Sequence, residues 1–153
     1  MALFDIDFPE DLMSDLLDTD FAEIAEEALA EAAPILEKAM KESGKAVIMH
    51  EGDSEMVESI KAGKPKRTKT DAWIVNVTFK GYSSIKKYTA VDSKGRKTHR
   101  KYPISNSLKA IWKEYGIPGR QPPRPFLESA KNAAQSAVNK KIQEVYNRKV
   151  GAK

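Results

Sequence analysis

The strongest helical pattern lies in residues 20–40, which read DFAEIAEEALAEAAPILEKAM. Its apolar residues recur at i, i+3, i+4 and i+7, which places them on one face of a helix. They are Phe21, Ile24, Ala25, Ala28, Leu29, Ala32, Ile35, Leu36, Ala39 and Met40. With Asp20 as N-cap and Glu23 as its capping-box partner, this pattern predicts a long helix over residues 20–49. Pro34 inside it predicts a kink or a short break, because its ring clashes with the preceding turn.

The other face of this predicted helix is acidic. It carries Glu23, Glu26, Glu27 and Glu31 at positions that the apolar face leaves outward. We consider this acidic face a candidate subunit interface. The alternative is an ordinary solvated face, which is what most charge runs are.

The segments on either side are shorter. Residues 1–19 form an N-terminal arm, or a short helix over about 9–17 that starts at Pro9. After the long helix, Gly52 is a candidate helix stop and Asp53 or Ser54 a candidate cap for a second helix reaching Ile60. The basic residues 61–69 are typical of a loop, with phosphate or acidic-partner contact as the functional alternative.

Two β features follow. Residues 72–79 alternate, with Trp73, Val75, Val77 and Phe79 on one face, and predict a strand. Residues 85–91 and 96–102 flank the turn signal Asp92-Ser93-Lys94-Gly95 and predict a hairpin. The hairpin is strongly basic and is a candidate partner-binding or DNA-facing surface, through Lys86, Lys87, Lys94, Arg96, Lys97, Arg100 and Lys101. The alternative is that edge lysines prevent sheet-to-sheet aggregation.

Two further helices complete the chain. Ser105-Asn106-Ser107 predicts the cap of a short helix that ends at Gly116, with Leu108, Ile111, Trp112 and Tyr115 on its apolar side. A proline-rich connector, residues 117–124, leads to Pro125, which starts a long final helix with an alanine-rich stripe. We expect a single α+β domain over residues 20–147, in which a long N-terminal and a long C-terminal helix pack on a small antiparallel sheet with an extended hairpin. Residues 148–153 are expected to fray.

The charge distribution is uneven along the 153 residues. Residues 1–60 hold 17 acids and 3 bases, whereas residues 61–153 hold 23 bases and 5 acids, for a net charge of +4. Opposite charges on one chain suit docking between neighbouring copies, because complementary potentials steer association. The alternative is that the acidic helix folds onto the basic sheet of its own chain.

The sequence argues against several classes of protein. There is no cysteine, so disulfides and thiolate sites are excluded. No apolar run is long enough for a membrane span, and the N-terminus lacks the pattern of a signal peptide. His50 and His99 have no partners at metal-ligand spacing. No phosphate-binding glycine loop or serine nucleophile motif is present. We therefore expect no enzyme, no metal and no cofactor.

Three stretches resemble a known family. They are Gly52-Asp53-Ser54-Glu55-Met56-Val57-Glu58-Ser59-Ile60-Lys61, then Glu114-Tyr115-Gly116, then Pro123-Arg124-Pro125-Phe126-Leu127-Glu128-Ser129-Ala130. Their order and spacing resemble those of the neck or tail-completion proteins of long-tailed bacteriophages, which are often described as minor tail components. The candidate motif residues are Gly52, Ser59, Ile60, Glu114, Tyr115, Gly116, Arg124, Pro125 and Phe126. The segment Ile117-Pro118-Gly119-Arg120 and the long basic hairpin depart from that pattern.

The resemblance implies a structural virion protein at the head–tail junction, present in the host cytoplasm during assembly. Its implied partners are copies of itself in a ring of six or twelve, head-closure or connector proteins, and tail terminator or tail tube proteins. A basic hairpin that faces the lumen of such a ring would also suit non-specific contact with passing DNA, and no membrane partner is expected. Heterologous ring contacts need two different complementary patches on each subunit.

Two other hypotheses stay open at the level of sequence. The first is a free nucleic-acid-binding module, because residues 61–101 carry 13 bases and 2 acids and include aromatic residues that can stack on bases. The second is a small regulatory or toxin-like protein whose site has no sequence motif.

Overall fold

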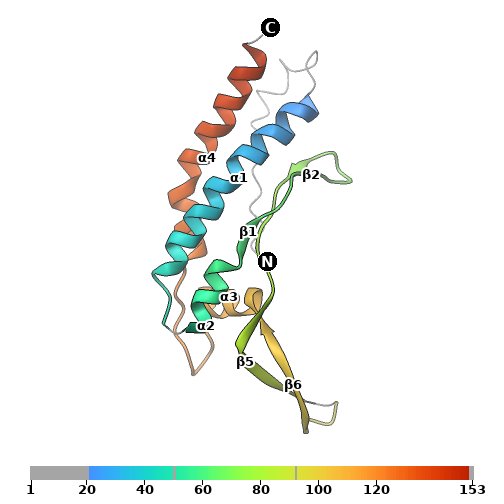
Figure 1. Cartoon of the computed structure of the whole chain (residues 1–153), viewed down its shortest axis with the longest axis vertical. Helices are drawn as coiled ribbons and strands as arrows, with labels where there is room; N and C mark the ends of the chain where they lie inside the picture. The colour runs from blue at the N-terminus through green and yellow to red at the C-terminus, as the bar shows by residue number, and fades with distance from the viewer. Residues whose placement is uncertain (1–20, 50, 92, 152–153) are drawn as a thin grey trace.

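The computed structural model describes residues 21–49, 51–91 and 93–151 of the chain (Figure 1). The predicted arm or helix in residues 1–19 and the proposed cap Asp20 lie outside these residues. The order of elements is helices, strands, helix, helix, so the fold is α+β. Within the described part, no helix is long and apolar enough to cross a membrane.

Two long helices form the body of the molecule. α1 (Phe21–Lys45) and α4 (Leu127–Val150) lie side by side in Figure 1 and run antiparallel. Small residues let their backbones approach, since Ala28 and Ala32 on α1 and Ala130 and Ala134 on α4 are almost fully buried in one core cluster. The first turns of α1 contact the last turn of α4, where Arg148 on α4 reaches Glu27 and Glu31 on α1.

A kink or a short break was predicted at Pro34, and the break is absent, because α1 continues through this residue without interruption. Pro34 and the residue whose carbonyl loses its partner, Ala30, are both exposed. Water can therefore donate a hydrogen bond to the Ala30 carbonyl in place of the N–H that Pro34 lacks. This lowers the free-energy cost of a proline inside the helix.

α2 (Glu51–Glu58) follows α1 after a turn, and its bounds correct two predictions. Gly52 and Asp53 lie inside α2 rather than before it, so Gly52 does not end a helix. Asp53 still binds the preceding backbone, because its Oδ2 accepts from the Met49 N–H at 3.1 Å.

The strands form three separate antiparallel pairs rather than one small sheet. β1 (Ile60–Ala62) pairs with β4 (Val77–Phe79), β2 (Lys66–Arg67) pairs with β3 (Trp73–Ile74), and β5 (Tyr82–Val91) pairs with β6 (Lys97–Ser105). Residues 61–69 are thus not all loop, and the strand predicted over 72–79 is split. Between its halves Val75 is buried beside Leu29 and Ala33, and Asn76 accepts a hydrogen bond from the Gly63 N–H.

The hairpin of β5 and β6 is confirmed and is longer than predicted. It extends away from the two long helices, at the end of the molecule opposite the C-terminus (Figure 1). α3 (Asn106–Tyr115) begins directly after β6, and the Ser105 hydroxyl accepts from the Leu108 N–H as the predicted cap. α4 continues through Arg148, Lys149 and Val150, past residue 147, where we expected the folded domain to end.

The core lies where α1, α2, β1, β4 and α4 meet. Its largest fully buried side chain is Phe126, which packs edge-on against Phe79 with ring centroids 6.1 Å apart. Glu37 anchors β1 to α1, because its Oε2 accepts from the Ala62 N–H at 2.7 Å.

Candidate protein-interaction surface

The two C-terminal motif stretches meet at the start of α4. The residue before that helix, Phe126, supplies no side-chain cap. Glu114 from the end of α3 supplies it instead, since its carboxylate accepts from the backbone N–H groups of Phe126 (2.9 Å), Leu127 (2.8 Å) and Glu128 (3.3 Å). These are donors that a helix leaves without partners in its first turn, and an anion there also interacts well with the helix dipole.

Gly116 makes this arrangement possible. Its φ is +76°, and a Cβ at this position would lie 2.7 Å from the Gln121 carbonyl oxygen and 2.8 Å from the Pro123 nitrogen. The connector folds back on itself through hydrogen bonds between Ile117 and Gln121, and the Arg124 N–H donates to the Lys113 carbonyl at 2.7 Å. The motif residues Glu114, Gly116 and Phe126 therefore belong to one hydrogen-bonded unit, which we call the α3–α4 junction.

The first motif stretch lies against the other end of α3. Gly52 is buried, and a Cβ there would lie 3.2 Å from the Lys109 ammonium nitrogen, which donates to the Gly52 carbonyl. Ser59 donates through its hydroxyl to the Met56 carbonyl at 2.7 Å, and Ile60 is fully buried. The three motif stretches thus contact α3, but they do not converge on one open site.

Sequence reasoning missed the charged side of α3. Lys113 and Asp53 form a buried ion pair with 2.7 Å between Nζ and Oδ2, and Lys109 lies 3.9 Å from the Glu55 carboxylate. Hydrogen bonds from the Ser84 hydroxyl, together with the Ser84 N–H, Lys109 and Ser83, hold the pKa of Glu55 below its ordinary value. No local pattern signals this cluster, because Lys113 and Asp53 are 60 residues apart.

The apolar side of α3 is partly turned outward, with Leu108 and Trp112 half-buried. Lys109, Ala110, Lys113 and Glu114 are buried, whereas Tyr115 is 76% exposed and Ile111 is 40% exposed. The buried charges have partners on α2 and α4, so the fold can place this polar side inward without leaving ions unpaired.

The outward side of α3 borders an apolar groove. The groove has a volume of about 390 Å³ and lies between β4, α3 and the start of α4. We call it the α3 groove, and its lining residues are Val77, Thr78, Phe79, Ser107, Ala110, Ile111, Tyr115 and Leu127.

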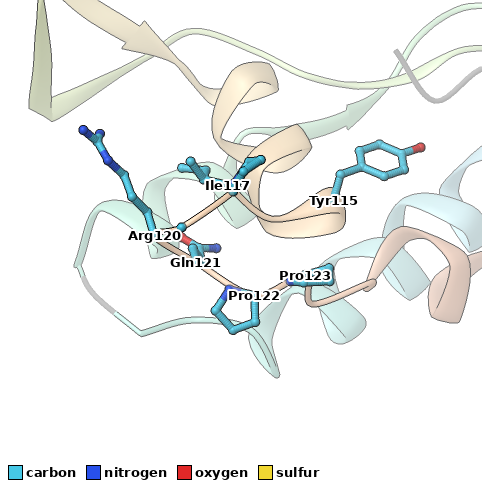
Figure 2. A pocket seen from close by; sticks show the side chains of 8 residues that line it. Tyr115, Ile117, Arg120, Gln121, Pro122 and Pro123 are labelled. Carbon is cyan, nitrogen blue, oxygen red and sulfur yellow. The ribbon is translucent and has the colours of Figure 1, made fainter.

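A second hollow lies on the other side of Tyr115. Figure 2 shows it along the connector, with Tyr115, Ile117, Arg120, Gln121, Pro122 and Pro123 around it. Tyr115 lines both hollows. The side chains of Tyr115 and Arg120 point away from each other on either side of the second hollow (Figure 2), and tyrosine and arginine are residue types that are enriched at protein–protein interfaces. The motif residues Arg124 and Pro125 follow this connector, and they are half-buried and exposed respectively.

Most of the candidate acidic face is occupied within the chain. Arg148 Nη2 lies 2.5 Å from both Glu27 and Glu31, and Lys149 Nζ lies 2.8 Å from Glu23 and 2.7 Å from Glu27. Hydrogen bonds from Lys149 and Arg148 hold the pKa of Glu27 below its ordinary value. Glu26 is exposed beside them. The acidic helix thus binds basic residues of its own chain, on α4 rather than on the sheet.

The basic residues around the hairpin turn are exposed. Lys94, Arg96 and Lys97 are exposed at and beside its turn, and Lys86, Lys87, Arg100 and Lys101 are residues of its two strands. Tyr82 (67%) and Tyr102 (39%) are exposed aromatic residues on the same hairpin.

Among the described residues there is no group of three or more histidine, aspartate or glutamate side chains placed to hold a metal ion. Comparison with protein-family models, with curated proteins and with solved structures finds no match for this chain.

Proposed function

We propose that the chain is a structural protein of the head–tail junction of a tailed bacteriophage. In this proposal it is a neck or tail-completion protein, which forms a ring between the connector and the tail tube. It binds its neighbours and transforms no substrate. Its partners are further copies of itself, a head-closure or connector protein on one side, and a tail terminator or tail tube protein on the other.

The observation that carries the proposal is the α3–α4 junction. The stretches that resemble the neck family, Glu114-Tyr115-Gly116 and Arg124-Pro125-Phe126, are joined there by direct hydrogen bonds. A resemblance in two separate motifs is better supported when the residues of those motifs contact each other in the folded chain. The outward side of the same junction presents Tyr115 and the α3 groove, as an adhesive protein requires.

The charges of the chain support a binding role. The buried Lys113 ammonium pairs with the Asp53 carboxylate, and the buried Glu114 carboxylate binds backbone N–H groups at the start of α4. Such pairs hold elements in position. The exposed basic hairpin suits contact with an acidic neighbour or with DNA that passes through a ring, because attraction to phosphate needs no sequence readout.

Deletion of the gene from the phage or prophage that carries it tests the proposal. Electron microscopy of the lysate should show DNA-filled heads and separate tails, and expression of the intact chain from a plasmid should restore joined particles. Joined, infectious particles in the absence of the protein would contradict the proposal. Genes for portal, capsid and tail tube proteins beside this gene are expected as well.

A free nucleic-acid-binding module is the second candidate function. The exposed Lys94, Arg96 and Lys97 with Tyr82 and Tyr102 favour it, since cationic and aromatic side chains together bind single strands. It requires binding of isolated protein to DNA that weakens steeply with salt. Lys94→Glu with Lys97→Glu should then weaken binding, whereas Lys38→Glu on the exposed side of α1 should not. No binding at low salt eliminates this candidate.

A further inference from the structure

The β2–β3 pair forms a second basic projection of the chain, which the proposed function does not use. We call residues 64–72 the basic finger, since they hold β2, the segment before it and the turn that leads to β3. In Figure 1 the basic finger projects from the side of α1 that faces away from α4. Its four cations are exposed, and they are Lys64, Lys66, Arg67 and Lys69.

Hydrogen bonds and packing hold the basic finger in place. The Thr68 N–H donates to the Ala72 carbonyl at 2.8 Å, and the Asp71 N–H donates to the Thr68 carbonyl at 3.1 Å. At the base of the finger, Trp73 packs against the small core cluster that includes Leu29 on α1. The four cations are therefore carried by a folded support that is fixed to the body of the molecule.

The positive charge of the basic finger is only partly neutralised by the described residues. Arg67 pairs with Asp71, the only acid of the finger, at 3.3 Å. Glu26 adds one exposed carboxylate on the side of α1 where the finger packs, because it lies one turn before Leu29. Three cations have no carboxylate of the described residues within ion-pair distance, and they are Lys64, Lys66 and Lys69. An anionic partner is therefore attracted to the finger.

The composition of the basic finger fits a phosphate backbone better than a protein or a membrane. Residues 61–72 contain no large apolar or aromatic side chain. Protein interfaces are depleted in lysine and depend on buried aromatic and apolar anchors, and binding to a membrane surface also needs apolar side chains. Contacts to nucleic acid phosphates need only cations, hydroxyl groups and backbone N–H groups. The finger supplies cations, and the exposed Thr70 adds a hydroxyl group beside Lys69.

We propose that the basic finger binds the phosphate backbone of double-stranded DNA without reading its sequence. A duplex is favoured over a single strand, because the finger has no aromatic ring on which bases can stack and a duplex carries one charge per about 1.7 Å. The inference goes beyond the neck function, since it concerns a property of the isolated chain. It differs from the second candidate function in the element that binds, β2 rather than the β5–β6 hairpin, and in the form of DNA.

Fluorescence anisotropy of a labelled duplex, titrated with the full chain at several salt concentrations, tests the proposal. Lys66→Gln with Lys69→Gln removes two cations of the finger at exposed positions. We expect about tenfold weaker binding at low salt, and a slope of log affinity against log salt that is shallower by about 2, because each phosphate contact contributes about 0.9. Lys131→Gln with Lys140→Gln is the matched control. It removes the same charge from exposed positions of α4, away from the finger (Figure 1), and should leave the slope unchanged.

Three results would overturn the inference. The first is no binding of the natural chain to the duplex at low salt. The second is an equal loss of affinity and of slope in the finger variant and the α4 variant, because net charge alone would then explain the effect. The third is tighter binding of polyglutamate or of a single strand than of the duplex, which would assign the finger to an acidic protein or the binding to aromatic residues elsewhere. Equal thermal midpoints of both variants and the natural chain verify that the fold is intact.

The DNA titration and the gene deletion are independent. Separated heads and tails on deletion, together with no binding to the duplex, would leave the neck function standing and remove the DNA contact of the finger. Binding that depends on Lys66 and Lys69, in a chain whose deletion leaves particles joined, would keep the DNA contact and remove the neck function.

Discussion

At the scale of single residues, one carboxylate holds two helices together. Glu114 belongs to α3, yet its oxygens accept the first backbone donors of α4. Because the cap of α4 comes from α3, it fixes the position of α4 relative to α3. A cap from a residue next to α4 in the sequence would not fix that relative position. The cost of losing it should therefore exceed that of removing an exposed acid nearby.

Glu114→Ala tests this cap. It leaves the buried N–H groups of Phe126 and Leu127 without an acceptor, and we expect a loss of about 1–3 kcal/mol in the free energy of unfolding. Glu128→Ala, at an exposed position in the first turn of α4, is the control and should change little. Equal urea midpoints for the two variants would show that Glu114 is not the cap.

Gly116→Ala and Gly119→Ala separate two costs of a side chain at positive φ. Both glycines have φ above +70°, but a Cβ meets nothing within 4 Å at Gly119 and three backbone atoms within 3.0 Å at Gly116. Gly119→Ala should cost about 1 kcal/mol for its backbone conformation alone. Gly116→Ala should cost clearly more in the same urea titration. A smaller effect at Gly116 than at Gly119 would contradict the packing of the connector.

Phe126→Ala removes the largest side chain of the core. The ring is 1% exposed, and truncation should lower the free energy of unfolding by about 3–5 kcal/mol. Tyr115→Ala, which removes a ring of similar size at a position 76% exposed, serves as the comparison and should cost far less. An unchanged thermal midpoint for Phe126→Ala would refute its role in the core.

At the scale of elements, the sequence predicts where α3 begins and ends, but it does not predict which side of α3 is buried. The Ser105 cap and the end at Gly116 were predictable, because both depend on neighbours in the sequence. The spacing of Leu108, Ile111, Trp112 and Tyr115 correctly marks an apolar side. It cannot tell that the other side is buried, because that depends on Asp53 and on the first turn of α4, which are distant in the sequence.

The contact between α1 and the end of α4 should depend on pH. Lys149 and Arg148 hold the pKa of Glu27 below its ordinary value, so the folded chain releases this proton at lower pH than the unfolded chain. The resulting stabilisation is present above the unfolded value of about 4.3 and is lost as pH falls through the folded pKa.

Arg148→Ala tests that dependence. At pH 7 and low salt it should lower the thermal midpoint slightly, since exposed pairs contribute little. The difference from the natural chain should disappear on acidification and in high salt. Lys131→Ala, an exposed position on the same helix, controls for the loss of a positive charge. A difference that persists in acid would assign the effect to packing instead.

At the scale of the whole molecule, the two long helices and the hairpin differ in how many buried side chains stabilise them. The helices share a core of many buried side chains, whereas the described side chains of the hairpin include only Ser83 and Ile104 as buried ones. The register of β5 with β6 is also irregular at two places. The hairpin should therefore open without unfolding of the helices.

Native-state hydrogen exchange measures this difference. We expect backbone amides of β5 and β6, such as those of Thr89 and Tyr102, to exchange about 10- to 100-fold faster than those of Ala28 and Ala134 in the helical core. Uniform protection across both regions would mean that the chain unfolds as one unit.

The sequence predicted the α+β class, both long helices and the hairpin, since each depends on periodicity or on a turn signal. It did not predict three separate strand pairs, because the division at Val75 and Asn76 follows from contacts with α1 and Gly63. The motif residues around Glu114 and Gly116 were visible in the sequence, but their hydrogen bonds were not. Lys109 and Lys113 were missed altogether, because lysines on a short helix usually face water.

The bond from Glu114 to α4 has a mechanical consequence. Tyr115 follows Glu114 directly, so a load applied at Tyr115 by a bound neighbour acts on α4 through that carboxylate and bypasses the connector of residues 117–124. A displacement of α3 would therefore also move the start of α4, while the proline-rich connector could change its conformation without changing the relative position of the two helices.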